Sequence, residues 1–250
     1  PEELNITDPA LIEGIHGQYA AAGSRIVNAN TFGASAHKLA GSAYTLEQVI
    51  TAGIENCKRA CAPYGALTAL DVGPLGELLE PSGTLAFEDA VAEYARIVKA
   101  GEAAGADLIF FETYTDLYEL KAALLAAKEN THLPILASMS FEAGGRTFTG
   151  CTVESFAATA RGLGADAVGI NCSLGPKEIF PMAKRLAEAV PGNFPVFVKP
   201  NAGLPRADGS GYDITPQLFA LQMKPYRELH LFAAGGCCGT TPEFIKLLNG

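Results

Sequence analysis

The sequence lacks the features that mark several common classes of protein. No stretch of its 250 residues approaches the roughly 18 uninterrupted apolar residues of a membrane helix, so we expect no membrane partner. No charged-then-apolar signal segment opens the chain, which favours a cytoplasmic location. Lysine and arginine form no cluster and the formal net charge is −9, so the basic face that a nucleic-acid partner requires is missing. The expected partner is a small molecule or another protein.

Charged residues are also scarce, at 18%, whereas hydrophobic residues make up 48% of the chain. This balance is typical of a soluble globular protein with a large core. The length suits one large domain or two small ones, and single α/β barrels commonly have about this length.

Short apolar segments alternate with helical patterns along the whole chain. Apolar residues on both faces are typical of strands in a covered parallel sheet. The expected strands are residues 25–30, 66–71, 107–111, 134–139, 165–171, 194–199 and 231–234. The expected helices are residues 9–22, 45–63, 84–104, 153–163, 176–190 and 216–229, with further helices after 116–119 and from 242. Pro181 lies inside one of them, where proline kinks a helix or marks a later start.

Seven strand–helix units in succession favour an α/β fold of the (β/α)8 TIM barrel type over an open doubly wound sheet. The number is one short of eight, and an open barrel would leave two exposed parallel edges. The chain begins at Pro1, without an initiator methionine. We therefore expect residues 1–250 to form a single barrel domain whose first strand is missing from this sequence.

The six cysteines do not form the pattern of a disulfide framework in a chain of this size. Cys57 and Cys61 are four residues apart in a predicted helix, so we expect them to share a face as small buried hydrophobes. Cys151 is predicted at a helix start, in a structural role. The other three follow predicted strands: Cys172, Cys237 and Cys238.

The carboxyl ends of the strands form the working face of such barrels. Polar and sulfur-containing residues occupy nearly all of these ends, and three cysteines fall on the same rim. The residues are Asn30, Thr31, Asp71, Glu112, Thr113, Ser140, Asn171, Cys172, Lys199, Asn201, Cys237 and Cys238.

Three thiolates without a neighbouring histidine indicate zinc, which accepts tetrahedral sulfur sites and keeps one position open when it is catalytic. Their formal charge makes the ion a poor Lewis acid for generating hydroxide but suits it to binding a substrate thiol, which points to alkyl transfer onto sulfur. Gly235, Gly236 and Gly239 are expected to supply unusual backbone angles. The alternatives are a closed four-ligand zinc site, a pair of buried thiols and a redox-active vicinal disulfide.

Residues 169–176 and 235–243 closely resemble the homocysteine S-methyltransferase family, particularly the homocysteine-binding barrel of its cobalamin-dependent methionine synthase branch. Further matching segments are residues 30–34, 71–74, 111–113, 148–150 and 200–203. The Asp-Gly-x-x-Gly-Thr segment that the family has on its first strand is absent, in agreement with the missing strand.

The resemblance implies that Cys172, Cys237 and Cys238 bind Zn2+ and that homocysteine supplies the fourth ligand as its thiolate. It implies that Glu112 receives the ammonium group of the substrate. Two amides, those of Asn171 and Asn201, would flank the metal as acceptors or temporary ligands; capping the next loop is the alternative role. The residues expected to shape the substrate pocket are Asn30, Thr31 and Asp71.

The activity implied is methyl transfer to homocysteine in methionine biosynthesis. Gly-Thr-Thr-Pro after the cysteine pair is more like the corrinoid-using branch, so methylcobalamin is the expected donor. The corrinoid-binding segment Asp-x-His-x-x-Gly is absent, which places that donor on another domain or protein. S-methylmethionine or betaine is the alternative donor. More remote alternatives are a Schiff-base aldolase that uses Lys199 and a non-catalytic thiol- or corrinoid-binding module.

Overall fold

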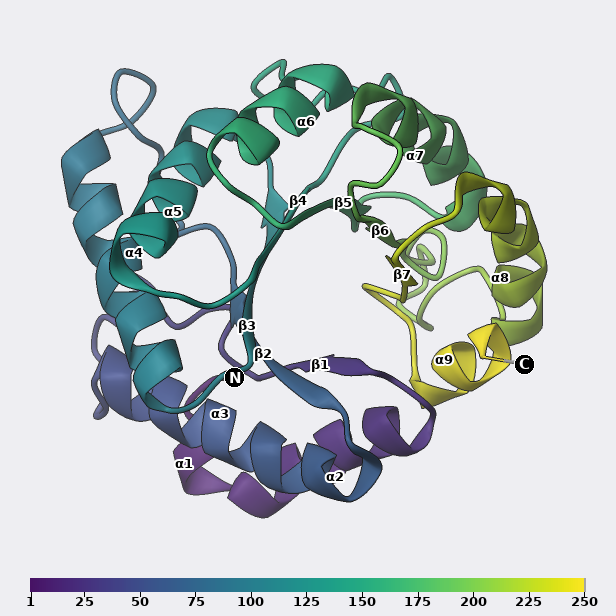
Figure 1. Cartoon of the computed structure of the whole chain (residues 1–250). Coiled ribbons are helices and arrows are strands. Elements are labelled where there is room, and N and C mark those ends of the chain that lie inside the picture. Colours follow the sequence, from purple (N-terminus) through teal and green to yellow (C-terminus); the bar gives the residue numbers. More distant parts are fainter. Residues whose placement is uncertain (250) are drawn as a thin grey trace. The chain divides into compact units, whose positions relative to one another are not determined.

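The computed structural model describes residues 1–249, which form an α/β fold with one parallel sheet (Figure 1). Seven strands follow one another in the sheet in the order of the chain, as the sequence predicts. They are β1 (Ile26–Asn28), β2 (Leu67–Val72), β3 (Leu108–Tyr114), β4 (Ile135–Met139), β5 (Ala167–Asn171), β6 (Val196–Lys199) and β7 (Ala233–Ala234). The fold class is confirmed: a (β/α)8-type arrangement that has one strand fewer than eight within the described residues.

Helices connect the strands throughout. They are α1 (Leu4–Thr7), α2 (Pro9–Ala21), α3 (Leu46–Cys61), α4 (Phe87–Ala103), α5 (Leu117–Asn130), α6 (Val153–Gly162), α7 (Pro176–Ala189), α8 (Pro216–Met223) and α9 (Pro242–Leu248), with 3-10 turns η1 (Ala62–Tyr64) and η2 (Lys224–Leu229). Across residues 1–249, none of the helices is long and apolar enough to cross a membrane.

Local signals place most helix starts. The Gln48 backbone N–H donates to the Thr45 hydroxyl at 3.2 Å, and the Thr45 backbone N–H donates to the Gln48 side-chain oxygen at 2.9 Å. These two hydrogen bonds complete the predicted capping box of α3. Asp8 caps α2. The helix α7 begins at Pro176, as predicted, where proline suits the first turn. Of the two alternatives for Pro181, a later start is therefore ruled out, and this proline lies inside the helix.

The chain forms two compact units, one of residues 1–114 with 118–136 and the other of residues 115–117 with the chain from 137 onward. In the first unit, β1, β2 and β3 pair in parallel, and α2 and α3 pack on one face of β1 (Figure 1). In the second unit, β5, β6 and β7 pair in parallel, with Asn171 opposite Lys199 and Val198 opposite Ala234. Nearly every residue of β3 and β5 is buried, as expected for a covered parallel sheet.

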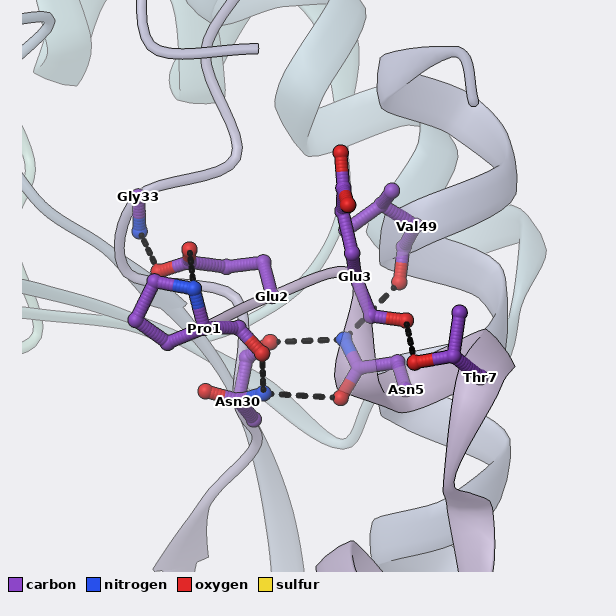
Figure 2. A network of polar contacts seen from close by, with 8 residues as sticks. All are labelled: Pro1, Glu2, Glu3, Asn5, Thr7, Asn30, Gly33 and Val49. Carbon is purple, nitrogen blue, oxygen red and sulfur yellow. Dashed lines mark hydrogen bonds and ion pairs between the residues drawn. The ribbon is translucent and has the colours of Figure 1, made fainter. Parts of the chain in front are cut away.

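Helix α1 was not predicted, because its four residues are too few to show a helical period. Figure 2 shows the contacts that hold it. The buried Asn5 amide donates to the carbonyl oxygen of Asn30 at 2.7 Å and to that of Val49 at 3.1 Å. Glu2 accepts from the Gly33 backbone at 2.9 Å. The helix is therefore stabilised by tertiary hydrogen bonds to the loop after β1 and to α3.

Candidate metal centre

Three thiols meet in the second unit. Cys172 directly follows β5, while Cys237 and Cys238 follow β7 after two glycines. All three sulfur atoms lie within 4.8 Å of one another, and the sulfur atoms of Cys172 and Cys238 are 3.7 Å apart. The tertiary structure thus brings together the three cysteines that the sequence singled out.

The backbone at Cys172 is strained in a way that the sequence did not reveal. Cys172 and Ser173 both have left-handed conformations, with φ of 63° and 62°, and neither is glycine. The Leu174 backbone N–H donates to the Cys172 carbonyl at 2.8 Å, which closes a very tight turn. Such conformations cost of order 1–3 kcal/mol each and cluster at functional sites. The turn sets the direction of the Cys172 side chain at the end of β5.

The three glycines around the cysteine pair serve different purposes. Among the three, Gly239 has a positive φ, of 77°. Gly236 is needed for space, because a Cβ atom there would lie 2.5 Å from the Thr240 hydroxyl. A Cβ atom at Gly235 would meet Lys199 at an ordinary 3.4 Å. The expectation of an unusual backbone angle is therefore confirmed at Gly239, whereas Gly236 is glycine for lack of space.

Two amides border the thiols. The buried Asn171 accepts from the Ser138 hydroxyl at 2.8 Å, and its Nδ2 lies 3.8 Å from the sulfur of Cys237. The hydrogen bond from Ser138 orients the Asn171 amide so that its NH2 group faces the sulfur of Cys237. Asn201 instead accepts from the Cys238 backbone N–H at 3.1 Å, so its oxygen braces the loop that carries the cysteine pair.

The thiols influence one another's ionisation. Hydrogen bonds from Cys172 and then Cys237 lower the pKa of Cys238 to about 2. The same contacts and burial raise the pKa of Cys172, because they favour its protonated form. The hydrogen bond with Cys172 lowers the pKa of Cys237, but the hydrogen bond with Cys238 and burial outweigh it, so this pKa is raised overall. Lys199 lies opposite Asn171 in the sheet, and its positive charge acts to lower the pKa of Cys237. The cluster therefore holds a thiolate at Cys238 first.

A second group of predicted residues lies in the first unit, at the carboxyl ends of its strands. Glu112, on β3, is only 8% exposed and accepts from the Asn28 amide at 3.4 Å. The next residue, Thr113, has a left-handed φ of 66°. A buried carboxylate next to a strained residue is the kind of group that binds a cation or an ammonium ion.

The other predicted residues of the first unit, Asn30, Thr31 and Asp71, take part in hydrogen bonds within that unit. The Thr31 hydroxyl donates to the Asp71 carbonyl at 2.8 Å and accepts from the Asp71 backbone N–H at 3.1 Å. The Asn30 amide donates to Asn5 at 3.0 Å (Figure 2). These contacts join the loop after β1 to β2 and to α1.

The remaining cysteines have structural surroundings. All six cysteines are free, in line with the prediction that they form no disulfide framework. Cys57 and Cys61 are buried on one face of α3, as predicted. Cys151 is half-buried and precedes α6, which begins two residues later behind the cap Thr152.

The chain is similar to known proteins over the whole of its described length. The model of the family described as homocysteine S-methyltransferase matches residues 1–249. Methionine synthase from Mycobacterium tuberculosis (strain ATCC 25618 / H37Rv) is 32% identical over 262 residues, which cover 98% of this chain and 22% of that protein. Methionine synthase from Mycobacterium leprae (strain TN) is 32% identical over 264 residues, which cover 98% of this chain and 21% of that protein. The chain thus spans about a fifth of the length of these curated relatives.

The solved structures of the Escherichia coli homocysteine methyltransferase MmuM have the same fold. Its metallated form matches with a TM-score of 0.83 and 22% identity, over 98% of this chain and 86% of that one. Its apo form matches with a TM-score of 0.78 and 24% identity, over 100% of this chain and 88% of that one.

Proposed function

Since the chain belongs to the homocysteine S-methyltransferase family, we propose that it transfers a methyl group to the thiol of homocysteine to give methionine. We further propose that Cys172, Cys237 and Cys238 hold the zinc ion that this reaction uses. The observation that carries the proposal is the convergence of three thiols from two strand ends within 4.8 Å.

The thiols fit zinc in both chemistry and spacing. Zinc–sulfur bonds of about 2.3 Å in a tetrahedral site place sulfur atoms about 3.8 Å apart. The sulfur atoms of Cys172 and Cys238 are 3.7 Å apart. A donor set made only of thiolates suits a soft or borderline metal such as zinc better than magnesium or calcium. The metallated form of MmuM is consistent with metal binding on this fold.

Bound zinc would supply the means to keep a substrate thiol ionised and nucleophilic at neutral pH. Three thiolates give a divalent ion a net formal charge near −1, which disfavours the activation of water and favours acceptor chemistry on sulfur. The chain contributes the positions of the ligands: Asn171 directs its amide toward Cys237, and Asn201 holds the Cys238 backbone. Lys199 adds a positive charge near Cys237 that offsets part of this negative charge.

We assign the substrate ammonium group to Glu112, because it is a buried carboxylate at the carboxyl end of a strand. Asn28 donates to one of its oxygens and restricts its orientation. Asn30, Thr31 and Asp71 would shape the pocket indirectly, through the bonds that join the loop after β1 to β2 and α1.

The methyl donor that we propose is methylcobalamin carried by a corrinoid-binding domain or protein. The support is the sequence after the cysteine pair and the greater length of the methionine synthase relatives, of which this chain matches about a fifth. S-methylmethionine and betaine are the competing donors.

The metal assignment is tested by measuring the zinc content of the purified protein. We expect one zinc per chain in the wild type and its loss in Cys172→Ala, Cys237→Ala and Cys238→Ala, with the circular dichroism spectrum retained. Cys151→Ala is the matched control and should keep the metal. Zinc retained by all three rim variants would overturn the assignment.

The reaction is tested by supplying homocysteine with methylcobalamin, S-methylmethionine or betaine in separate assays and measuring methionine. Methionine from methylcobalamin alone is the expected result. Tight homocysteine binding without methionine from any donor would instead support a non-catalytic module. Borohydride trapping of a carbonyl substrate on Lys199 would support the aldolase alternative.

A further inference from the structure

The loop that follows β6 folds into a hairpin beside the cysteine pair. Pro205 and Tyr212 form an antiparallel bridge. The Asp213 backbone N–H donates to the Leu204 carbonyl at 3.1 Å, and the Leu204 N–H donates to the Asp213 carboxylate at 2.8 Å. The Arg206 N–H donates to the Gly211 carbonyl at 2.8 Å. This segment, residues 204–213, is therefore held in one shape by its own hydrogen bonds.

The base of the hairpin is tied to the metal centre. The Ala202 N–H donates to the Cys238 carbonyl at 2.9 Å, and the Ile214 N–H donates to the Ala202 carbonyl at 3.0 Å. On the amino side of the same residue, Asn201 accepts from the Cys238 N–H at 3.1 Å. Ala202 and Asn201 therefore hold both polar groups of the Cys238 backbone, and Ala202 also bonds to the base of the hairpin.

One side chain of the hairpin reaches the thiols themselves. The Tyr212 ring lies against Gly239, where a Cβ atom would come within 2.3 Å of two ring carbons. Its hydroxyl lies near enough to the Cys238 sulfur to donate a hydrogen bond toward it. Gly239 thus has two reasons to be glycine, the space that the ring occupies and a φ of 77°.

We propose that Tyr212 is a positioning residue of the metal centre, which holds the Cys238 sulfur through its hydroxyl and the Gly239 turn through its ring. The inference rests on the proposed function, since it assigns a role within the same site. Hydrogen bonds to ligands orient them and tune their bonds to the metal. The hydroxyl should draw charge from the Cys238 sulfur, while the ring should keep that sulfur in place.

The two parts of the side chain can be separated by substitution. Tyr212→Phe removes the hydroxyl and keeps the ring, so zinc affinity should stay within about threefold of the wild type while the sulfur environment changes. Tyr212→Ala removes both, so zinc affinity should fall by about tenfold or more, the range seen when an outer partner of a ligand is lost. The control is Phe148→Ala, which removes the most exposed aromatic side chain of the same unit and should change neither property.

The experiment uses the full chain with Zn2+ or Co2+ as the probe. Zinc dissociation constants come from competition with a chelator, and the thiolate-to-cobalt absorption bands report on the sulfur ligands. We expect shifted bands in Tyr212→Phe and weakened binding in Tyr212→Ala. Bands unchanged in Tyr212→Phe together with wild-type affinity in Tyr212→Ala would overturn the inference and leave the metal assignment intact. A wild-type protein that binds neither ion would overturn both.

Discussion

Two pairs of cysteines in this protein have almost the same spacing and different surroundings. The sulfur atoms of Cys57 and Cys61 are 3.8 Å apart in α3, and those of Cys172 and Cys238 are 3.7 Å apart at the strand ends. The helix pair is at most 1% exposed, and the hydrogen bond to Cys61 together with burial raises the pKa of Cys57. The rim pair has a third thiol and an exposed member. The distance between two sulfurs therefore does not by itself mark a metal site, and the rim pair differs from the helix pair in having a third thiol close by.

Removing one cysteine from the helix pair and one from the cluster of three rim thiols tests this contrast directly. Cys237→Ala should lower zinc affinity at least about a hundredfold, because each ligand contributes about 3 kcal/mol or more to a structural zinc site. Cys61→Ala should keep one zinc per chain and lower the free energy of unfolding by about 1 kcal/mol through lost packing. Chelator competition and urea unfolding measure the two quantities. Equal loss of metal in both variants would contradict the distinction.

The same contrast applies to two buried carboxylates of the first unit. Glu119 accepts from the Leu75 N–H at 2.7 Å and from the Tyr94 hydroxyl at 2.9 Å, so it serves the fold. Glu119→Leu should lower the free energy of unfolding by about 2–3 kcal/mol, because two buried donors lose their acceptor. Glu112→Gln should leave stability nearly unchanged and raise the KM for homocysteine about tenfold, the loss expected for a charged hydrogen bond. Urea unfolding and steady-state kinetics distinguish the two. The roles would be reversed if Glu112→Gln unfolded readily and kept its KM.

The next comparison concerns a buried histidine, His16, which lies outside the predicted site. His16, on α2, is buried, and its Nδ1 has no hydrogen-bond partner among residues 1–249. Burial lowers its pKa to about 4. As the pH falls from 6.5 toward 4, the unfolded chain binds a proton that the folded chain does not, so stability decreases. The loss between pH 7 and pH 5 should be on the order of 2 kcal/mol.

Urea unfolding across this pH range measures the effect. His16→Leu should remove most of the slope, whereas His132→Gln, which replaces an exposed histidine, is the control that retains it. An unchanged slope in His16→Leu would assign the pH dependence to other groups.

The smallest expected effect concerns the strained turn beside the rim thiols. Ser173→Gly should raise the free energy of unfolding by up to about 1 kcal/mol, because glycine tolerates a φ of 62°. In a domain of this size that corresponds to roughly 2–4 °C in Tm. Ser155→Gly, in the first turn of α6, should have the opposite sign. Scanning calorimetry measures both, and a lower Tm for Ser173→Gly would show that the turn is not strained.

The sequence alone determined the strand–helix succession and the choice of three cysteines. Both depend on short-range patterns: apolar runs predict buried strands, Thr45 and Gln48 complete their capping box within one turn, and parallel strands end at a shared edge. The differences between the predicted and the observed helices are also confined to short segments. Residues 224–229 form a 3-10 turn where an α-helix was expected, and α1 forms in a segment without an apolar pattern.

Only the tertiary structure decided which polar residues serve the fold and which face the thiols. Asn5 bonds to a residue 25 positions away, Asn171 reaches a sulfur 66 positions away, and Tyr212 reaches the cysteine pair through a hairpin. Residue type states what a side chain can donate or accept, but its partner depends on how the intervening chain packs. For the same reason, the left-handed backbone of Ser173 could not be anticipated, since serine does not favour it and the surrounding fold imposes it.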